Sequence, residues 1–155
     1  MGIRTRIFID FWNFQLNWND RPGGQRCDWK RLPSVRVRIR ERRTRAGGIW
    51  CNTCKQQILT CPQCSTAFER APEKGVDAAI VTDLLTLAWQ RAFDVAILLS
   101  SDADMIPAVE RVQERGLKVI NATWSGHGYD LAHTSWGSFA LDSVIGLLTR
   151  PATTI

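Results

Sequence analysis

Short apolar runs alternate with amphipathic segments along this chain, and their spacing predicts the secondary structure. Residues 5–11 form an apolar run with polar residues near its ends, as expected of a buried central strand. Residues 94–99 and 117–122 are further apolar runs of strand length. Residues 73–92 carry apolar side chains at spacings of three and four, which predicts a helix with Asp77 in its first turn.

Shorter elements fill the spaces between these segments. We expect helices over residues 13–19, 107–116 and 128–135, a short strand over 138–141 and a final amphipathic segment that ends near Leu148. Strands that alternate with helices predict an α/β fold with a mostly parallel sheet flanked by helices. Ligands of such folds gather at the carboxyl ends of the strands.

Arginines alternate strictly with other, mostly apolar residues over residues 35–42. Val35, Val37 and Ile39 fall on one face of an extended chain, and arginines fall on the other. This pattern predicts a half-buried strand whose arginine face can follow a phosphate backbone. A solvated charged face is the alternative interpretation. The residues that we expect to contact RNA are Arg36, Arg38, Arg40, Arg42 and Arg43.

Composition is consistent with one domain. The chain has 155 residues, 45% of them hydrophobic, which suits a single core. We expect one domain over residues 1–150, with residues 47–70 as an insertion and 151–155 as a tail. The net charge of +5 permits attraction to nucleic acid. No apolar stretch approaches the roughly 18 residues of a membrane helix and the first residues lack a signal cleavage site, so we expect a cytoplasmic protein outside membranes.

Four of the five cysteines form two Cys-x2-Cys pairs, Cys51 with Cys54 and Cys61 with Cys64. Thiols of a cytoplasmic protein stay reduced, so this spacing predicts a closed four-cysteine zinc site with a structural role. Free structural thiols are the alternative. Residues 47–70 have little periodicity, which suits a loop stabilised by a metal.

Aspartates follow two of the predicted strands and open the longest helix. Asp10 ends the first run, Asp102 and Asp104 follow the run that ends at Leu99, and Asp77 lies in the first helical turn. Each alone is an ordinary turn or capping residue. Carboxylates packed together repel unless a cation neutralises them, and Mg²⁺ or Mn²⁺ prefers such oxygen ligands. An acidic pocket of this kind suits phosphodiester chemistry.

The motifs that contain these aspartates resemble the NYN domains, a branch of the PIN-like nucleases. Residues 8–13 match F-I-D-x-x-N, residues 73–77 match E-K-G-V-D, and residues 100–104 match S-x-D-x-D after a V-A-I-L strand. Further similarity extends over residues 107–110, 118–121 and 126–139. The order of the motifs is specific, whereas each motif alone is not.

This resemblance implies a fold and an activity. The fold would be a three-layer PIN-like (Rossmann-like) domain with a mostly parallel sheet, carrying here a small four-cysteine zinc loop. The activity would be Mg²⁺- or Mn²⁺-dependent endoribonuclease cleavage of RNA phosphodiester bonds. In this family, the aspartates that match Asp10, Asp77, Asp102 and Asp104 are metal-binding and catalytic, and the asparagine that matches Asn13 assists them.

The segment after the first strand is shorter than in similar chains. About two dozen residues separate Asp10 from Arg36, where the family carries a further strand and helix. We therefore expect a narrower sheet, unless a second copy or another subunit completes it. Two alternatives remain: a zinc-stabilised RNA-binding or adaptor module without turnover, and a nuclease directed at DNA.

Seven tryptophans and two histidines complete the candidates. We expect Trp12 and Trp50 to be the two that can stack on bases, and Trp89 to be packed against the core. His127 and His133 fit surface or capping roles, and Asp83 fits a solvated or capping position on the helix.

Overall fold

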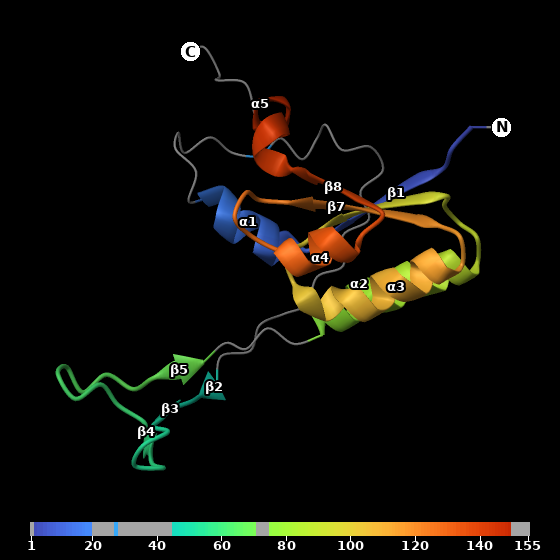
Figure 1. Cartoon of the computed structure of the whole chain (residues 1–155). Coiled ribbons are helices and arrows are strands. Elements are labelled where there is room, and N and C mark those ends of the chain that lie inside the picture. The colour runs from blue at the N-terminus through green and yellow to red at the C-terminus, as the bar shows by residue number, and fades with distance from the viewer. Residues whose placement is uncertain (1, 20–26, 28–44, 71–74, 150–155) are drawn as a thin grey trace. The chain divides into compact units, whose positions relative to one another are not determined.

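The computed structural model describes residues 2–19, 27, 45–70 and 75–149 of the chain, drawn as coloured ribbon in Figure 1. The chain divides into two compact units. One comprises Met1–Arg36 with Asp77–Ile155, and the other comprises Val37–Val76. We call their described parts the sheet unit and the cysteine unit.

The sheet unit is built on four parallel strands in the order β1-β6-β7-β8. Their bounds are β1 Thr5–Ile9, β6 Val95–Leu99, β7 Lys118–Thr123 and β8 Gly137–Ala140. Phe8 lies opposite Leu98, and Leu98 lies opposite Asn121. The parallel register brings the carboxyl ends of β1, β6 and β7 to one edge, which we call the carboxyl edge. The predicted mostly parallel sheet is confirmed.

Helices cover both faces of this sheet, as Figure 1 shows. Strand β6 shows why: Ala96 and Leu98 enter one buried cluster, whereas Ile97 and Leu99 pack against the other. The first cluster includes Leu84 of α2 and Val109 of α3. The helices are α1 Phe11–Asn19, α2 Val76–Trp89, α3 Ile106–Glu114, α4 Tyr129–Thr134 and α5 Ile145–Leu148, with 3₁₀ turns at Ala103–Met105 and Leu141–Val144.

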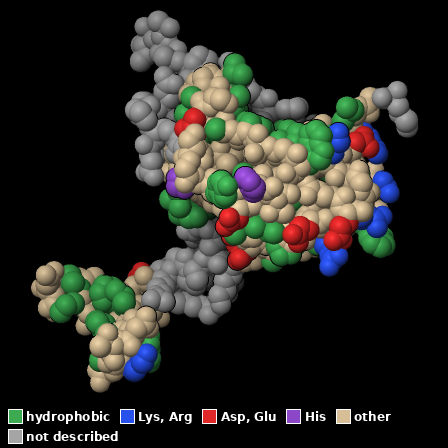
Figure 2. All heavy atoms as spheres, in the orientation of Figure 1, with side chains coloured by type: hydrophobic (Ala, Val, Ile, Leu, Met, Phe, Trp, Pro, Cys, Tyr) green, Lys and Arg blue, Asp and Glu red, His purple; other side chains and the backbone are tan. Residues whose placement is uncertain are grey.

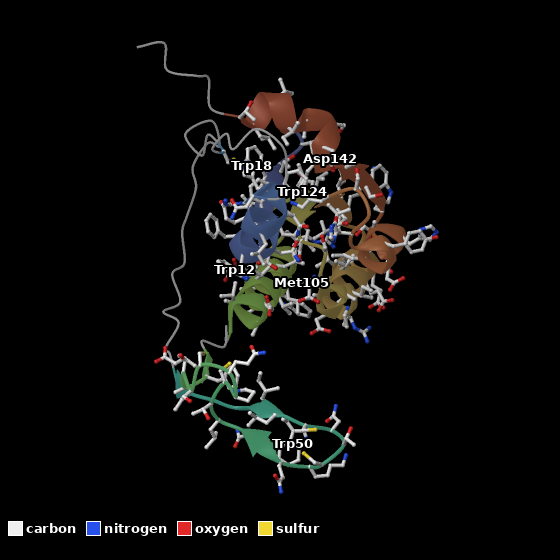
Figure 3. The ribbon with its side chains drawn as sticks, turned by 90° about the vertical axis from the view of Figure 1, so that its left-hand side faces the viewer. Trp12, Trp18, Trp50, Met105, Trp124 and Asp142 are labelled. Atoms are coloured by element: carbon white, nitrogen blue, oxygen red, sulfur yellow. The ribbon has the colours of Figure 1, made fainter. Side chains whose placement is uncertain are left out.

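The second cluster is aromatic. Phe14 and Trp18 of α1 pack against Trp124, with ring centroids 5.4 and 5.9 Å from it. Figure 3 shows Trp18 and Trp124 lying together beside Asp142. Cys27 is buried in this cluster and forms a β-bridge with Thr149. These contacts fix α1, which directly follows the predicted catalytic Asp10.

The cysteine unit consists of short antiparallel ladders. β2 (Arg45–Ala46) pairs with β5 (Glu69–Arg70), and β3 (Ile49–Trp50) pairs with β4 (Gln57–Ile58). Gly48 allows the close approach, because a Cβ there would lie 2.5 Å from the carbonyl oxygen of Ile58. We expected a loop here, and the structure instead shows hairpins, because ladders this short leave no periodicity in a sequence.

One sequence prediction lies outside the described residues, and another can be compared with the structure only within them. The arginine strand over residues 35–42, with Arg36, Arg38, Arg40, Arg42 and Arg43, lies outside them. Within the described part of the chain, no helix is long and apolar enough to span a membrane.

Candidate active site

Asp10 is a buried carboxylate at the end of β1. Only 5% of it is exposed, and its N–H donates to the carbonyl of Leu99 in the neighbouring strand at 3.0 Å. Its Oδ1 accepts from the N–H of Asn13 at 3.2 Å, and its carbonyl accepts from the N–H of Phe14 at 2.9 Å. Asp10 therefore caps α1, which is why the strand stops at Ile9 and does not reach Phe11.

Ser100 connects Asp10 to the acidic loop. Its hydroxyl, in a residue only 2% exposed, donates to Asp10 Oδ2 at 3.3 Å and accepts from the N–H of Asp102 at 3.1 Å. The Asp102 carboxylate in turn accepts from the N–H of Asp104 at 2.9 Å and so caps the 3₁₀ turn Ala103–Met105. One chain of hydrogen bonds thus runs from Asp10 to Asp104.

Asn13 joins the same network from α1. Its side-chain Oδ1 accepts from the N–H of Ser101 at 3.2 Å. The structure therefore brings four of the predicted site residues together at the carboxyl edge, namely Asp10, Asn13, Asp102 and Asp104. Asp102 is partly exposed and Asp104 is exposed, so both are accessible to a ligand.

Asp77 occupies the first turn of α2 and is exposed. Because α2 leads back to the start of β6, its first turn lies toward the carboxyl edge. Asp83 lies six residues further along the helix and is half-buried. Among the residues that the structure describes, no three histidine, cysteine, aspartate or glutamate side chains form a group able to hold a metal ion. The metal-binding role of the four aspartates stays a prediction.

Three residues that the sequence did not single out support the acidic loop. Buried Asn121 donates from Nδ2 to the carbonyls of Leu98 and Ser100, at 3.1 and 2.9 Å. Thr123 Oγ1 lies 2.8 Å from Ser101 Oγ. Gly128 packs so closely that a Cβ would lie 2.8 Å from the Cα of Ser101.

One of these residues carried a sequence signal. A polar Asn121 inside an otherwise apolar strand needs buried hydrogen-bond partners, which marks it for a structural role. Its Oδ1 has no hydrogen-bond partner among the described residues. Burial of this acceptor costs free energy, which the two hydrogen bonds donated by Nδ2 offset.

The aromatic predictions had different outcomes. Trp12 and Trp50 are 41% and 54% exposed, so part of each side chain faces solvent. Trp89, which we expected to be packed, is 72% exposed, so that prediction was wrong. Helix α2 carries apolar side chains on several sides, interrupted by two aspartates and two threonines, so the sequence pattern did not reveal which apolar side is covered. His127 and His133 are exposed, and His133 stacks on Tyr129 with ring centroids 4.7 Å apart.

The two cysteine pairs adopt the same turn. The N–H of Lys55 donates to the carbonyl of Cys51 and that of Ser65 to the carbonyl of Cys61, at 2.9 and 2.8 Å. Lys55 and Ser65 both have a φ of 57°, a left-handed conformation that is uncommon for residues other than glycine. Two identical turns of this kind present each pair of thiols in the same way.

Local hydrogen bonds favour the thiolate at one cysteine of each pair. The N–H of Cys54 lowers the pKa of Cys51, helped by its side chain and by the N–H of Thr53. The Thr66 hydroxyl, 3.3 Å from the Cys64 sulfur, and its N–H lower the pKa of Cys64. All five cysteines are unpaired by disulfides.

Comparison with known proteins identifies the domain as a whole. A family model described as the NYN domain matches residues 4–134. An uncharacterized protein y4oD from Sinorhizobium fredii (strain NBRC 101917 / NGR234) is 49% identical over 47 residues. That match covers 30% of this chain and only 22% of the relative. No solved structure matches the chain significantly.

Proposed function

This chain belongs to the NYN domain family, and from that membership we propose that it is a metal-dependent endoribonuclease. The observation that carries the proposal is the hydrogen-bonded network of Asp10, Asn13, Asp102 and Asp104 at the carboxyl edge. Parallel sheets bind their ligands at this edge. Asp77 completes the proposed site from the first turn of α2.

The donor set fits Mg²⁺ or Mn²⁺. It offers only oxygen ligands, three carboxylates and an amide in the network, which hard cations prefer. Such ions typically use one or two carboxylates and complete their shell with water and substrate phosphate, so they do not require a preformed group of three. When bound, the ion would activate a water molecule and offset charge on the phosphate.

The chain itself would perform the positioning. The Ser100 hydroxyl and the Asn13 N–H hold both oxygens of Asp10 in place, while the N–H of Asp104 orients Asp102. Arg36, Arg38, Arg40, Arg42 and Arg43 are proposed to guide the RNA backbone, as their spacing predicts. We place this activity in the cytoplasm.

Cleavage of a labelled RNA tests the proposal. We expect cleavage by the full chain with Mg²⁺ or Mn²⁺, loss of it with chelator, and loss of at least about a hundredfold in rate for Asp102→Asn. Asp130→Asn is the matched control, because Asp130 is an exposed aspartate on α4 outside the network. A single-stranded DNA of the same sequence separates RNA from DNA preference. Unchanged cleavage in Asp102→Asn and in chelator would overturn the assignment.

The two cysteine turns are proposed to hold one Zn²⁺ through Cys51, Cys54, Cys61 and Cys64. Four thiols on two matching turns are the donor set of a structural zinc site. Elemental analysis of the purified chain should give about one zinc per chain, falling in Cys54→Ser and unchanged in Cys27→Ala, whose thiol is buried in the aromatic cluster. If the purified chain contains no metal and is fully stable, these cysteines are free thiols and the zinc proposal is wrong.

A second candidate function follows from one observation. Because only about two dozen residues separate Asp10 from Arg36, where the family carries a further strand and helix, the chain also fits an RNA-binding adaptor that does not turn over. That function would give salt-sensitive RNA binding without metal-dependent cleavage. The cleavage experiment distinguishes the two functions directly.

A further inference from the structure

The end of the sheet opposite the candidate active site carries two exposed tryptophans, each next to a cation. Trp89 ends α2 and is 72% exposed, with the Arg115 guanidinium carbon 4.2 Å from its ring centroid. Trp136 precedes β8 and is 60% exposed, with Lys118 Nζ 4.0 Å from its centroid. Both contacts are within cation–π range.

The two pairs belong to one surface. Arg115 is the C-cap of α3 and Lys118 begins β7, so only Gly116 and Leu117 separate the two cations along the chain. The surface lies where the strands begin, and we call it the amino edge. Its members are Arg4, Arg6, Trp89, Arg91, Arg115, Lys118 and Trp136.

The charge of the amino edge is mostly uncompensated. Arg4 is bound to Asp94 at 2.9 Å, and the nearby Glu114 is bound to Arg111 at 2.7 Å. Within the described residues, no ion pair neutralises the remaining cations, which are Arg6, Arg91, Arg115 and Lys118. Figure 2 shows Lys and Arg side chains gathered at the right-hand end of the sheet unit, with apolar side chains next to them.

Exposed indole rings beside unpaired cations match one class of ligand closely. Bases of single-stranded nucleic acid stack on aromatic faces, and their phosphates need cations. A duplex hides its base faces, and an acidic peptide offers no flat group for the rings. A shallow, open depression lined by Leu85, Thr86, Trp89 and Gln90 lies at one of the two rings.

We infer that the amino edge is a second RNA-contact surface, which binds single-stranded RNA away from the candidate active site. A five-residue strand at about 3.3 Å per residue separates the two ends of the sheet by roughly 17 Å. One RNA strand that reaches both ends must therefore run across the sheet unit. This inference rests on RNA being the ligand in the proposed function, but it does not require cleavage.

Binding of a labelled oligouridine to the full chain tests the inference. The oligomer has about 20 nucleotides, longer than the ~4–16 nucleotides that single-strand-binding folds cover, and Asp102→Asn in every variant prevents its cleavage. Adding Trp89→Ala and Trp136→Ala should weaken binding about tenfold or more. An abasic oligomer of equal length has no bases to stack, so its affinity should not change. Both tryptophans are exposed, and thermal melting checks that the fold is kept.

The cations have a separate signature and a matched control. The double variant Arg115→Gln with Lys118→Gln should bind both the oligouridine and the abasic oligomer more weakly. It should also reduce the slope of log affinity against log salt by about 1.4, because each phosphate contact contributes ~0.7 on a single strand. Arg111→Gln removes an exposed arginine of α3 that is paired with Glu114, and we expect it to change affinity less than about twofold.

Two results would overturn the inference. One is equal oligouridine affinity with and without the tryptophans. The other is a chain that self-associates in sedimentation and loses this association in Trp89→Ala with Trp136→Ala, while its RNA affinity is unchanged. The surface would then join two copies of the chain. A different result is that the chain with Asp102 intact binds RNA through the two tryptophans without ever cutting it. That result would contradict the proposed nuclease activity and leave this inference standing.

Discussion

The Ser100 hydroxyl donates a hydrogen bond of 3.3 Å to the carboxylate of Asp10, joining residues that follow two neighbouring strands. The same hydroxyl accepts from the N–H of Asp102. One buried side chain therefore sets the positions of two predicted metal ligands. Its removal should lower both the stability of the chain and the rate of cleavage.

We expect Ser100→Ala to lower the free energy of unfolding by about 1–3 kcal/mol, because it removes one hydrogen bond from a buried carboxylate and one from a backbone N–H. RNA cleavage should slow about tenfold or more. Chemical denaturation and initial cleavage rates measure the two effects. Ser143→Ala is the control, since that exposed hydroxyl bonds only the nearby Ala140 carbonyl, and it should change stability by less than about 0.5 kcal/mol. Wild-type behaviour of Ser100→Ala would show that the hydroxyl does not position the site.

Gly128→Ala should loosen the acidic loop. Gly128 has a φ of +64°, and a Cβ there would lie 2.8 Å from Ser101 Cα and 2.9 Å from Thr123 Oγ1. Gly126→Ala is a close control, because Gly126 has a φ of +83° and no atom within 4 Å of the added Cβ. Both variants incur the left-handed backbone cost of about 1–2 kcal/mol, but only Gly128→Ala should add a clash and reduce cleavage. Equal stability and equal activity of the two variants would exclude a role for this close packing.

Asp94 should contribute stability that depends on pH. Arg4, through its guanidinium and its N–H, lowers the pKa of Asp94 from 3.8 to about 2. A carboxyl whose pKa is depressed by folding stabilises the folded chain above its unfolded pKa, and this contribution is lost as the pH falls through the folded value. Asp94→Asn should therefore lower the denaturation midpoint at pH 7, and the difference from the parent chain should shrink between pH 4 and pH 2. A difference that stays constant over this range would mean that the charge of Asp94 contributes nothing.

Lys55→Gly and Ser65→Gly should stabilise the cysteine unit. Both positions have a φ of 57°, which glycine adopts without the strain of a Cβ. We expect each substitution to raise the stability by about 0.5–1 kcal/mol, since the greater freedom of glycine in the unfolded chain offsets part of the gain. Zinc release from the proposed four-cysteine site under titration with a chelator measures this effect. Lys55→Ala keeps the Cβ and serves as the control, and a loss of stability in the glycine variants would show that the turn is not strained.

Much of the fold could be predicted from local patterns. The four strands of the sheet unit lie within or close to the predicted runs, and α2 and α3 lie within their predicted segments to a few residues. These elements follow from apolar periodicity and from capping residues that act over one turn. The hairpins of the cysteine unit and the exposure of Trp89 were not predictable. Short ladders leave no periodic signal, and a helix with apolar side chains on several sides does not reveal which side is covered.

The sequence by itself determined that Asp10 and the loop from Ser100 to Asp104 each follow a strand, and that the cysteines form two equally spaced pairs. These are local facts, written within a few residues of chain. Only the tertiary structure decided that Ser100 reaches Asp10, that Asn121 and Gly128 support the loop, and that cations meet Trp89 and Trp136. Such contacts depend on the register of parallel strands and on how helix ends meet, and residues far apart in the sequence do not carry that information in any local pattern.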